Sequence, residues 1–380
     1  MNECGCDEQF FLKPVHSFLW YIAFIRLRIR IKTSKRKKYR VFKNCSSVTN
    51  GKFNEPSDCV LRKSEPHILF VTEKWCDSNP DLGLSNSFHN LFGSIRNAGI
   101  GTYDTFHFDE YAYENAKPGD DQLIDLCREK YPDLIILTFL VNGNFNPKLE
   151  TLCTIRRQLG IPIVAVWFDS VKFDVIYWME MLSPIVDLNV ALDSRFTYPH
   201  IVLHDRKFMN LWTPQDPTVF LDPNLERDID VSFVGSIRGR RDRIKGLKVL
   251  KREVNIYHVG GQREKPVSID EYANILMRSK ITLNFSGNKY FGHQMKGRVL
   301  EAMMCGAAVM ESDNPETSEW FKPMKDYIPF RGTKDLVDKV RYYLENDKER
   351  QKIARNGYLA ATQKYSCKRF WNVLLAEVEK

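Results

Sequence analysis

The sequence predicts an α/β protein in which two Rossmann-like, doubly wound domains face each other across a cleft, preceded by a basic N-terminal arm. Three observations lead to this prediction. The 380 residues exceed the ~150 that are typical of one domain. Short apolar runs alternate with amphipathic stretches in two successive series, as in parallel sheets with crossover helices. The formal net charge of +8 belongs to residues 1–66, which hold 14 Lys and Arg against 6 Asp and Glu.

The arm joins an eight-residue apolar run, Phe18 to Ile25, to nine cations between Arg26 and Arg40. The run is shorter than the ~18 residues that span a bilayer, and a secretory signal would carry its charge before the run. We therefore expect residues 13–43 to bind an anionic membrane surface, at about 1 kcal/mol per cation. A solvated arm and an edge strand from the alternation at 26–31 are the alternatives. Residues 44–66 are polar and are expected to form a linker.

The cysteines and the charge distribution bear on where in the cell the protein is expected and on whether it binds nucleic acid. Nine cysteines are scattered, and only Cys4 and Cys6 lie close together, which favours reduced thiols over disulfides or a metal site. We expect a cytoplasmic protein that is peripheral on the inner face of the membrane. Because the body carries no net charge, a nucleic-acid partner is not expected. Binding of nucleic acid through the basic arm is the remaining alternative.

The first series of elements, residues 67–222, predicts one Rossmann-like domain. Its strands are expected at 67–73, 102–108, 133–139, 161–168 and 186–192, and its helices at 88–97, 122–130 and 149–159. Parallel strands joined through helices place ligands at the carboxyl ends of the strands.

The second series, residues 223–364, predicts a similar domain, joined to the first near 214–223. Its strands are expected at 231–236, 254–260, 281–286 and 307–311, and its helices at 242–251, 269–278, 297–305, 333–346 and 348–364. Residues 365–380 are expected to form a helix that packs back on the first domain. The cleft between the two domains is the expected active site.

Two motifs in the second domain predict a site for a nucleotide diphosphate. The first strand runs into G-S-x-x-G-x-R, in which Gly235, Ser236, Arg238 and Arg241 could contact a phosphate at a helix start. A solvated turn is the alternative interpretation.

The second motif lies within 286–312. Lys296 and Arg298 stand at a helix start and Glu301 lies one turn inside, an arrangement suited to a diphosphate and a ribose. A surface ion pair between Arg298 and Glu301 is the alternative.

The segment R-V-L-E-A-M-M-C-G-A-A-V-M at 298–310, with Leu211–Asp222 and the helical stretch that follows residue 333, resembles the donor domain of GT-B glycosyltransferases, and most of all the CgeB-like group. The resemblance implies that Glu301 holds the donor ribose and that Arg298 contacts the diphosphate. His293 stands where retaining members have a glutamate, so it is a candidate catalytic residue. The resemblance also implies that no metal cofactor is needed, because cations and a helix dipole stabilise the leaving diphosphate.

On the acceptor side, Asp169 follows a strand that ends in Trp167-Phe168, and its carboxylate could deprotonate an acceptor hydroxyl. A helix cap or turn is the alternative role. Lys74, Trp75 and Asp77 follow the first strand and are expected, with Trp167, to line the acceptor side.

We therefore expect a hexosyltransferase of GT-B architecture, with the acceptor on 67–222 and a nucleotide-sugar donor on 223–364. The alternative is a non-catalytic, two-lobed nucleotide- or sugar-binding protein. The sequence leaves the base and sugar of the donor, the acceptor and the stereochemistry open.

Overall fold

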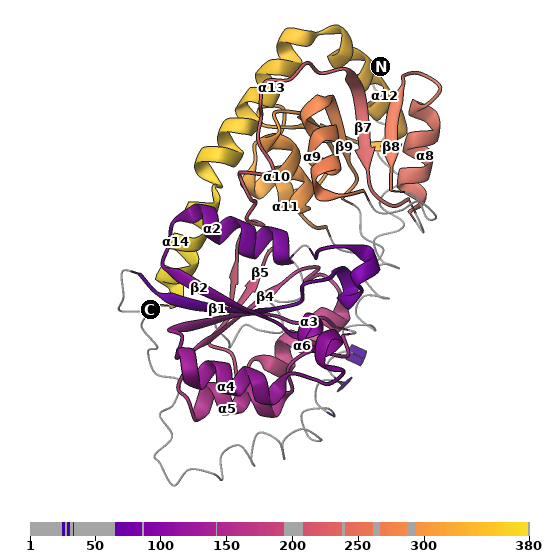
Figure 1. The fold of residues 1–380 in the computed structure, drawn as a ribbon. Coiled ribbons are helices and arrows are strands. Elements are labelled where there is room, and N and C mark those ends of the chain that lie inside the picture. Colours follow the sequence, from indigo (N-terminus) through magenta and orange to yellow (C-terminus); the bar gives the residue numbers. More distant parts are fainter. Residues whose placement is uncertain are drawn as a thin grey trace.

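The computed structural model describes residues 25, 26, 29, 30 and 33 of the arm and residues 65–85, 87–141, 143–193, 208–237, 240–260, 267–286 and 293–378 of the body. Two parallel sheets with helices packed against them form two lobes, one above the other in Figure 1. The two-domain α/β architecture predicted from the sequence is confirmed.

The N-terminal sheet has the order β2-β1-β3-β4-β5-β6, with every neighbouring pair parallel. Its strands are β1 (His67–Thr72), β2 (Thr102–His107), β3 (Leu134–Thr138), β4 (Ile163–Trp167), β5 (Leu188–Ala191) and β6 (Phe208–Asn210). Alternate residues of β1 enter different cores, Ile68 and Phe70 on one face of the sheet and Leu69 and Val71 on the other. Because both of their faces are buried, β1, β3 and β4 are nearly continuous apolar runs in the sequence.

Helices connect these strands on both faces of the sheet. They are η1 (Cys76–Ser78), η2 (Pro80–Leu82), η3 (Phe88–Gly93), α2 (Ser94–Ala98), α3 (Phe108–Asn115), α4 (Asp120–Lys130), α5 (Leu149–Arg157) and α6 (Phe173–Leu182). The helix predicted at 88–97 is a π-helical turn, η3, continued by α2, and it ends at Gly99 with φ of 64°. The sequence did not predict α3 or α6.

The C-terminal sheet has the order β11-β10-β9-β7-β8 and is also parallel. Its strands are β7 (Ile229–Val234), β8 (Ile256–Val259), β9 (Ser279–Asn284), β10 (Ala308–Ser312) and β11 (Ile328–Phe330). Its helices are α8 (Arg241–Leu250), α9 (Ile269–Arg278), α10 (Gly297–Met304), α11 (Pro315–Trp320), α12 (Gly332–Glu345), α13 (Asp347–Leu359) and η4 (Ala360–Lys364).

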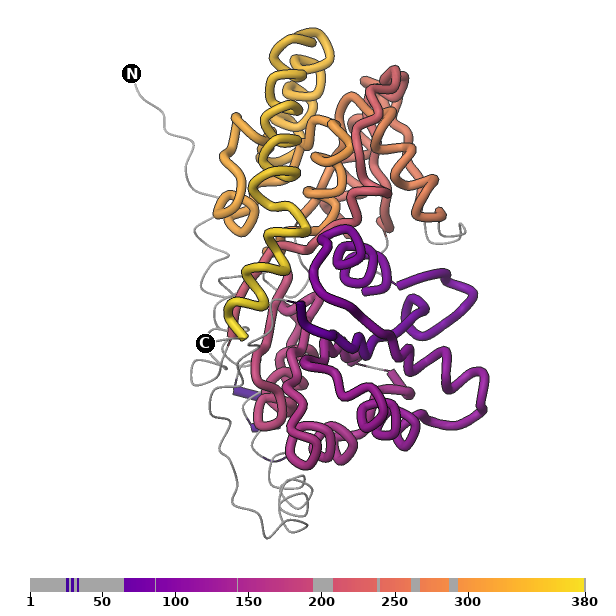
Figure 2. The backbone as a smooth tube through the Cα atoms, turned by 60° about the vertical axis from the view of Figure 1, so that its left-hand side comes forward, coloured from indigo at the N-terminus to yellow at the C-terminus, as the bar shows by residue number. Residues whose placement is uncertain are grey.

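The chain ends in α14 (Cys367–Val378), which lies against α2 of the N-terminal domain (Figures 1 and 2). Trp371 carries this contact: its indole nitrogen donates to Ser94 Oγ at 2.9 Å, and its ring lies 5.7 Å from that of Phe70. One hydrophobic core continues from this helix into the C-terminal domain, so the two domains share apolar packing.

Candidate active site

A cleft of about 820 Å³ separates the two domains. Its lower wall comes from the loops after β1, β4 and β5, and its upper wall from the ends of β7 and β8 and the starts of α9 and α10. Both sheets therefore present the carboxyl ends of their strands to the cleft, where parallel α/β sheets bind ligands.

Glu301 faces this cleft from the second turn of α10. Tyr272 of α9 donates its hydroxyl to Glu301 Oε2 at 2.5 Å. Burial raises the pKa of Glu301, while the bonds from Tyr272 and Gln215 and the charge of Arg298 oppose that rise. At Gly297, a Cβ would lie 2.9 Å from Glu301 Oε1, so the start of α10 has room for the carboxylate only because this residue is glycine. The sequence did not indicate Tyr272, since it lies on another helix.

Arg298 lies against the loop that leaves β7. A Cβ at Gly235 would lie 2.9 Å from Arg298 Nη2, and one at Gly260 would lie 3.0 Å from the Gly235 nitrogen. Two glycines thus let the guanidinium and two loops meet at one edge of the sheet. The Cζ of Arg298 lies 5.7 Å from the centre of the Phe233 ring, and its buried Nε has no hydrogen-bond partner within the described part of the chain. Gly235, Lys296, Arg298 and Glu301, four of the residues expected to bind the donor, all line the cleft.

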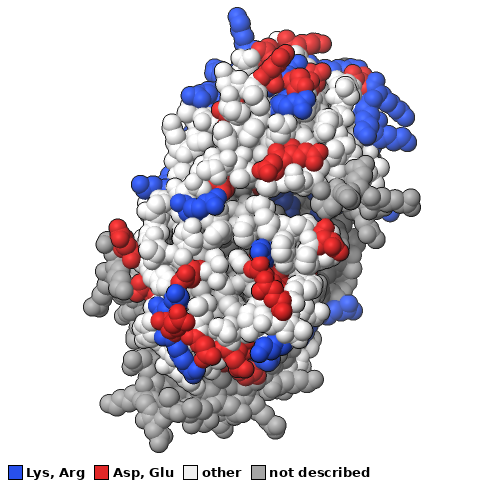
Figure 3. Space-filling model, viewed as in Figure 1, with Lys and Arg blue, Asp and Glu red and all other residues white. Residues whose placement is uncertain are grey.

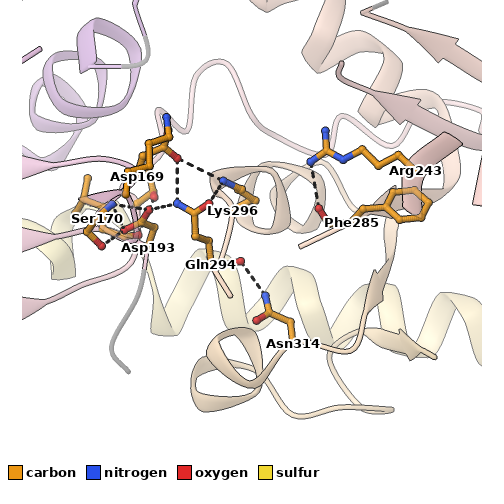
Figure 4. A network of polar contacts seen from close by, with 11 residues as sticks. Asp169, Ser170, Asp193, Arg243, Phe285, Gln294, Lys296 and Asn314 are labelled. Atoms are coloured by element: carbon orange, nitrogen blue, oxygen red, sulfur yellow. Dashed lines mark hydrogen bonds and ion pairs between the residues drawn. The ribbon is translucent and has the colours of Figure 1, made fainter. Parts of the chain in front are cut away.

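Arg243 is a buried cation beside this site that the sequence analysis missed. It donates to the Ser236 carbonyl at 2.7 Å. It also donates to the Phe285 carbonyl at 3.2 Å (Figure 4), so it links the loops after β7 and β9. Burial, and then the charge of Arg298, lower the pKa of Arg243 to about 10. It stays protonated near neutral pH and adds positive charge behind Arg298.

The other donor residues predicted from the first motif are placed differently. Arg241 is exposed at the start of α8 and does not line the cleft, because the helix turns Arg243 inward instead. Ser236 is exposed, and its contact with Arg243 is through the backbone carbonyl. Arg238 lies outside the described residues.

Asp169 faces the donor-side cations from the lower wall. It has φ of 55° directly after β4, pairs with Lys172 and lies 3.5 Å from Lys296 Nζ. Burial favours the neutral acid, but Lys296 and Lys172 together hold the pKa of Asp169 well below its usual range. Asp193, after β5, is its neighbour; burial and the Asp169 charge raise the pKa of Asp193 to about 6. The cleft thus places an ionised carboxylate opposite the wall that carries Lys296, Arg298 and Glu301.

The other residues predicted for the acceptor side do not line the cleft. Lys74 pairs with Glu110 and lies 4.9 Å from the Trp75 ring, while Asp77 points into solvent with φ of 50°. Trp167 is buried and donates to Asn189 Oδ1 at 2.9 Å.

Cys76 and Asp81–Leu84 form that part of the wall instead. The reason is that the loop after β1 is fixed to the buried Asp109, which accepts the backbone N–H groups of Lys74 and Trp75 at 2.8 and 3.0 Å.

His293 and an Asp-x-Asp pair bear on catalysis and on metal binding. His293 is exposed beside the buried Gln294 and is not part of the cleft wall. An Asp-x-Asp pair, Asp228 and Asp230, which the sequence analysis passed over, stands at the amino end of β7, away from the cleft. Its carboxylates pair with Arg278 and Lys280.

Comparisons with known proteins bear on the fold of the chain. Residues 226–376 match a protein family described as glycosyl transferase-like. No match was found among curated proteins. Similar solved structures include HepE of Anabaena in complex with UDP, at 10% identity over 82% of this chain and 99% of that chain (TM-score 0.52). Sucrose-phosphate synthase of Thermosynechococcus elongatus is 10% identical over 83% of this chain and 99% of that chain (TM-score 0.54). T4 phage BGT in complex with UDP-glucose is 15% identical over 83% of this chain and 99% of that chain (TM-score 0.50).

The chain therefore has a GT-B fold, and its C-terminal half carries a glycosyl transferase-like domain. Both were expected from the sequence. The CgeB-like assignment stays a prediction.

Proposed function

We propose that the protein is a glycosyltransferase that moves a hexose from a nucleotide-diphosphate sugar to an acceptor hydroxyl without a divalent metal ion. One observation carries the proposal: Glu301, Arg298 and Lys296 converge at the start of α10 on one wall of the cleft, opposite the carboxylate of Asp169. The motifs quoted above favour the CgeB-like group within this class.

On the donor side, each group has a distinct task. The start of α10 offers free backbone N–H groups and a partial positive charge to a diphosphate, and Arg298 and Lys296 add full charges. Glu301, oriented by Tyr272, would accept hydrogen bonds from the ribose hydroxyls. UDP or UDP-glucose occupies similar structures, so uridine diphosphate is our proposed leaving group.

On the acceptor side, Asp169 is the candidate base. Its carboxylate is ionised at neutral pH because Lys296 and Lys172 stabilise the charge, and it lies at the carboxyl end of β4 where the two walls meet. A hydroxyl placed between Asp169 and the donor would give up its proton to this carboxylate as the new glycosidic bond forms.

The test is hydrolysis of a panel of nucleotide sugars by the wild type and Glu301→Ala. Loss of charged hydrogen bonds worth ~1.5–3 kcal/mol each should lower kcat/KM by about tenfold to over a hundredfold. Glu226→Ala, at an exposed position, is the matched control. Binding of UDP by a wild type that turns over no donor would favour the non-catalytic alternative, and an unchanged rate in Glu301→Ala would remove Glu301 from the site.

The proposal of a membrane-associated enzyme concerns the arm. Over the described parts of the chain, we find no helix with the length and apolarity to cross a bilayer. Arg30 donates to Asp174 of α6 at 2.8 Å and lies 4.5 Å from the centre of the Tyr177 ring. Ile25 and Ile29, each of which is helical, are 39% and 58% exposed. We expect α6 to hold the arm while these side chains meet an anionic leaflet at the cytoplasmic face.

Liposome flotation with and without residues 1–44 tests this role. Wild type should float with anionic vesicles and not with neutral phosphatidylcholine vesicles, because the cations of the arm require anionic lipid. Binding that persists after deletion would assign membrane contact to the body instead.

A further inference from the structure

Three consecutive residues of the C-terminal domain, Gln294, Met295 and Lys296, contact the N-terminal domain directly before α10; we call them the strap. The Met295 backbone nitrogen donates to the Asp193 carbonyl at 2.8 Å, and the Met295 side chain is buried in the core shared by the domains. Lys296 Nζ lies 3.5 Å from Asp169 Oδ1. The strap therefore joins the donor-side wall of the cleft to the acceptor-side carboxylates.

Gln294 makes the central contact of the strap (Figure 4). Its side-chain nitrogen donates to Asp169 Oδ1 at 3.0 Å and also to Asp193 Oδ2, and its side-chain oxygen accepts from Lys296. A glutamine amide has two N–H donors and an acceptor oxygen, so this one group can donate to two carboxylates and accept from an ammonium group. Gln294 is 1% exposed and Asp193 is 8% exposed, and a buried carboxylate without a hydrogen-bond donor would be costly.

The backbone of Gln294 is fixed from behind by its own domain. Asn314, which follows β10, donates its side-chain nitrogen to the Gln294 carbonyl at 2.8 Å. The same nitrogen lies 3.1 Å from Glu311 Oε1, and Asn314 is itself 1% exposed. The direction of the Gln294 side chain is thus set by buried groups of the C-terminal domain.

We propose that Gln294 is a positioning residue for sugar transfer. From the donor domain, its amide orients the Asp169 carboxylate and keeps it beside Lys296. The candidate base is therefore correctly placed only where the two domains are in contact. The inference rests on the proposed function. Gln294 acts through Asp169 and is not itself a group that touches the reacting atoms.

The charges around this amide agree with the assignment. Asp169 and Asp193 both reach the one Gln294 nitrogen, so their carboxylates lie close together, and the Asp169 charge adds to burial in raising the pKa of Asp193. Lys296 and Lys172 face Asp169, and Ser170 donates to Asp193 from its backbone nitrogen and its hydroxyl. Donation by Gln294 lowers the pKa of both carboxyl groups.

Two substitutions of Gln294 test the proposal, assayed with the UDP-sugar that the wild type hydrolyses fastest. Gln294→Met removes the donors and the acceptor at similar size, and should lower kcat at least tenfold while the Kd for UDP changes less than threefold. Gln294→Glu places a third carboxylate against Asp169 and Asp193. It should raise the pKa of Asp169 and move the acid limb of kcat/KM upward by about one pH unit. Gln351→Glu is the control, because Gln351 donates to the single carboxylate of Asp347 on the exposed side of α13.

If Gln294 acts through Asp169, the effects of substituting Gln294 and Asp169 on kcat should not add. In an Asp169→Asn background, Gln294→Met should cost less than twofold, and this comparison decides the matter if Gln294→Glu does not fold. Wild-type kcat in Gln294→Met, or loss of both UDP binding and thermal stability with an unshifted pH profile, would overturn the proposal and leave the glycosyltransferase assignment standing. A wild type that neither binds UDP nor turns over any donor would overturn both.

Discussion

Substitution of Gly235 by alanine separates the proposed donor contact of Arg298 from general stability. At Gly235, φ is 151°, a conformation that residues with a Cβ rarely adopt, and the new methyl group would lie 2.9 Å from Arg298 Nη2. Strain of about 1–3 kcal/mol should lower the Tm by roughly 2–12 °C. The guanidinium is the flexible end of a long side chain, so it will move away. Its displacement should cost about 1.5–3 kcal/mol of charged hydrogen bonding, which raises the Kd for UDP roughly 10- to 150-fold.

Isothermal titration with UDP and thermal melting of the same samples measure both effects. Gly332→Ala is the control, because Gly332 also has positive φ, at 72°, but a Cβ there would meet no atom within 4 Å. It should lower the Tm through strain of about 1–2 kcal/mol and leave UDP affinity unchanged. A folded Gly235→Ala protein with wild-type affinity would show that Arg298 does not contact the diphosphate. Equal losses of affinity in the two variants would show that the effect is one of stability.

Three other predictions concern the domain junction, the metal and a buried acid. Trp371→Ala removes the indole that packs on Phe70 and bonds Ser94, and should lower stability by about 3–5 kcal/mol in calorimetry; an unchanged Tm would show that α14 does not hold the domains together. Dialysis against EDTA should leave the transfer rate within twofold of its starting value, and a loss restored by Mg²⁺ would contradict the metal-independent proposal. Burial raises the pKa of Glu311 to about 8, so the wild type should lose up to a few kcal/mol of stability as pH rises from about 4.5 to 8, where the unfolded chain ionises first. Glu311→Gln should remove this loss in denaturant melts, and an identical pH dependence would refute the assignment.

The apolar strands β1, β3 and β4 could be predicted from the sequence, and so could the less buried β2 and β8, whereas the shortest elements could not. β6 and β11 have three residues each, too few for any periodicity to appear. α6 is buried over most of its surface, including Val175, Ile176 and Met179, so it has no polar face to mark it as a helix. Fold class followed from the long elements, whereas the short and fully buried ones depend on tertiary packing.

The same distinction holds in the site. Lys296, Arg298 and Glu301 lie within six consecutive positions of one helix start, so their convergence could be read from spacing. Tyr272 reaches the site from α9, a separate segment of the chain. Gln294 lies only two residues before Lys296, but its partners Asp169 and Asp193 belong to the other domain, which no local pattern reveals.

Arg243 is a different case, because a signal existed. It shares one face of α8 with Gly246, Leu247 and Leu250, at spacings of three, four and seven residues. That periodicity marks the buried face and excludes Arg241 from it.

The junction of the domains is apolar, and this decides how distant residues can affect the chemistry. Trp212, on the segment that joins the domains, lies between the rings of Trp320, Tyr365 and Phe370, with centroids 5.2 to 6.0 Å apart. Packed aromatic rings resist small sliding motions, since each displacement opens a gap. These rings and α14 therefore hold the two domains together, and within that arrangement the polar groups of the strap place the Asp169 carboxylate beside Lys296. A substitution in this aromatic cluster should thus change kcat without any contact to donor or acceptor, because a shift of about 1 Å between the walls is enough to misplace reacting groups.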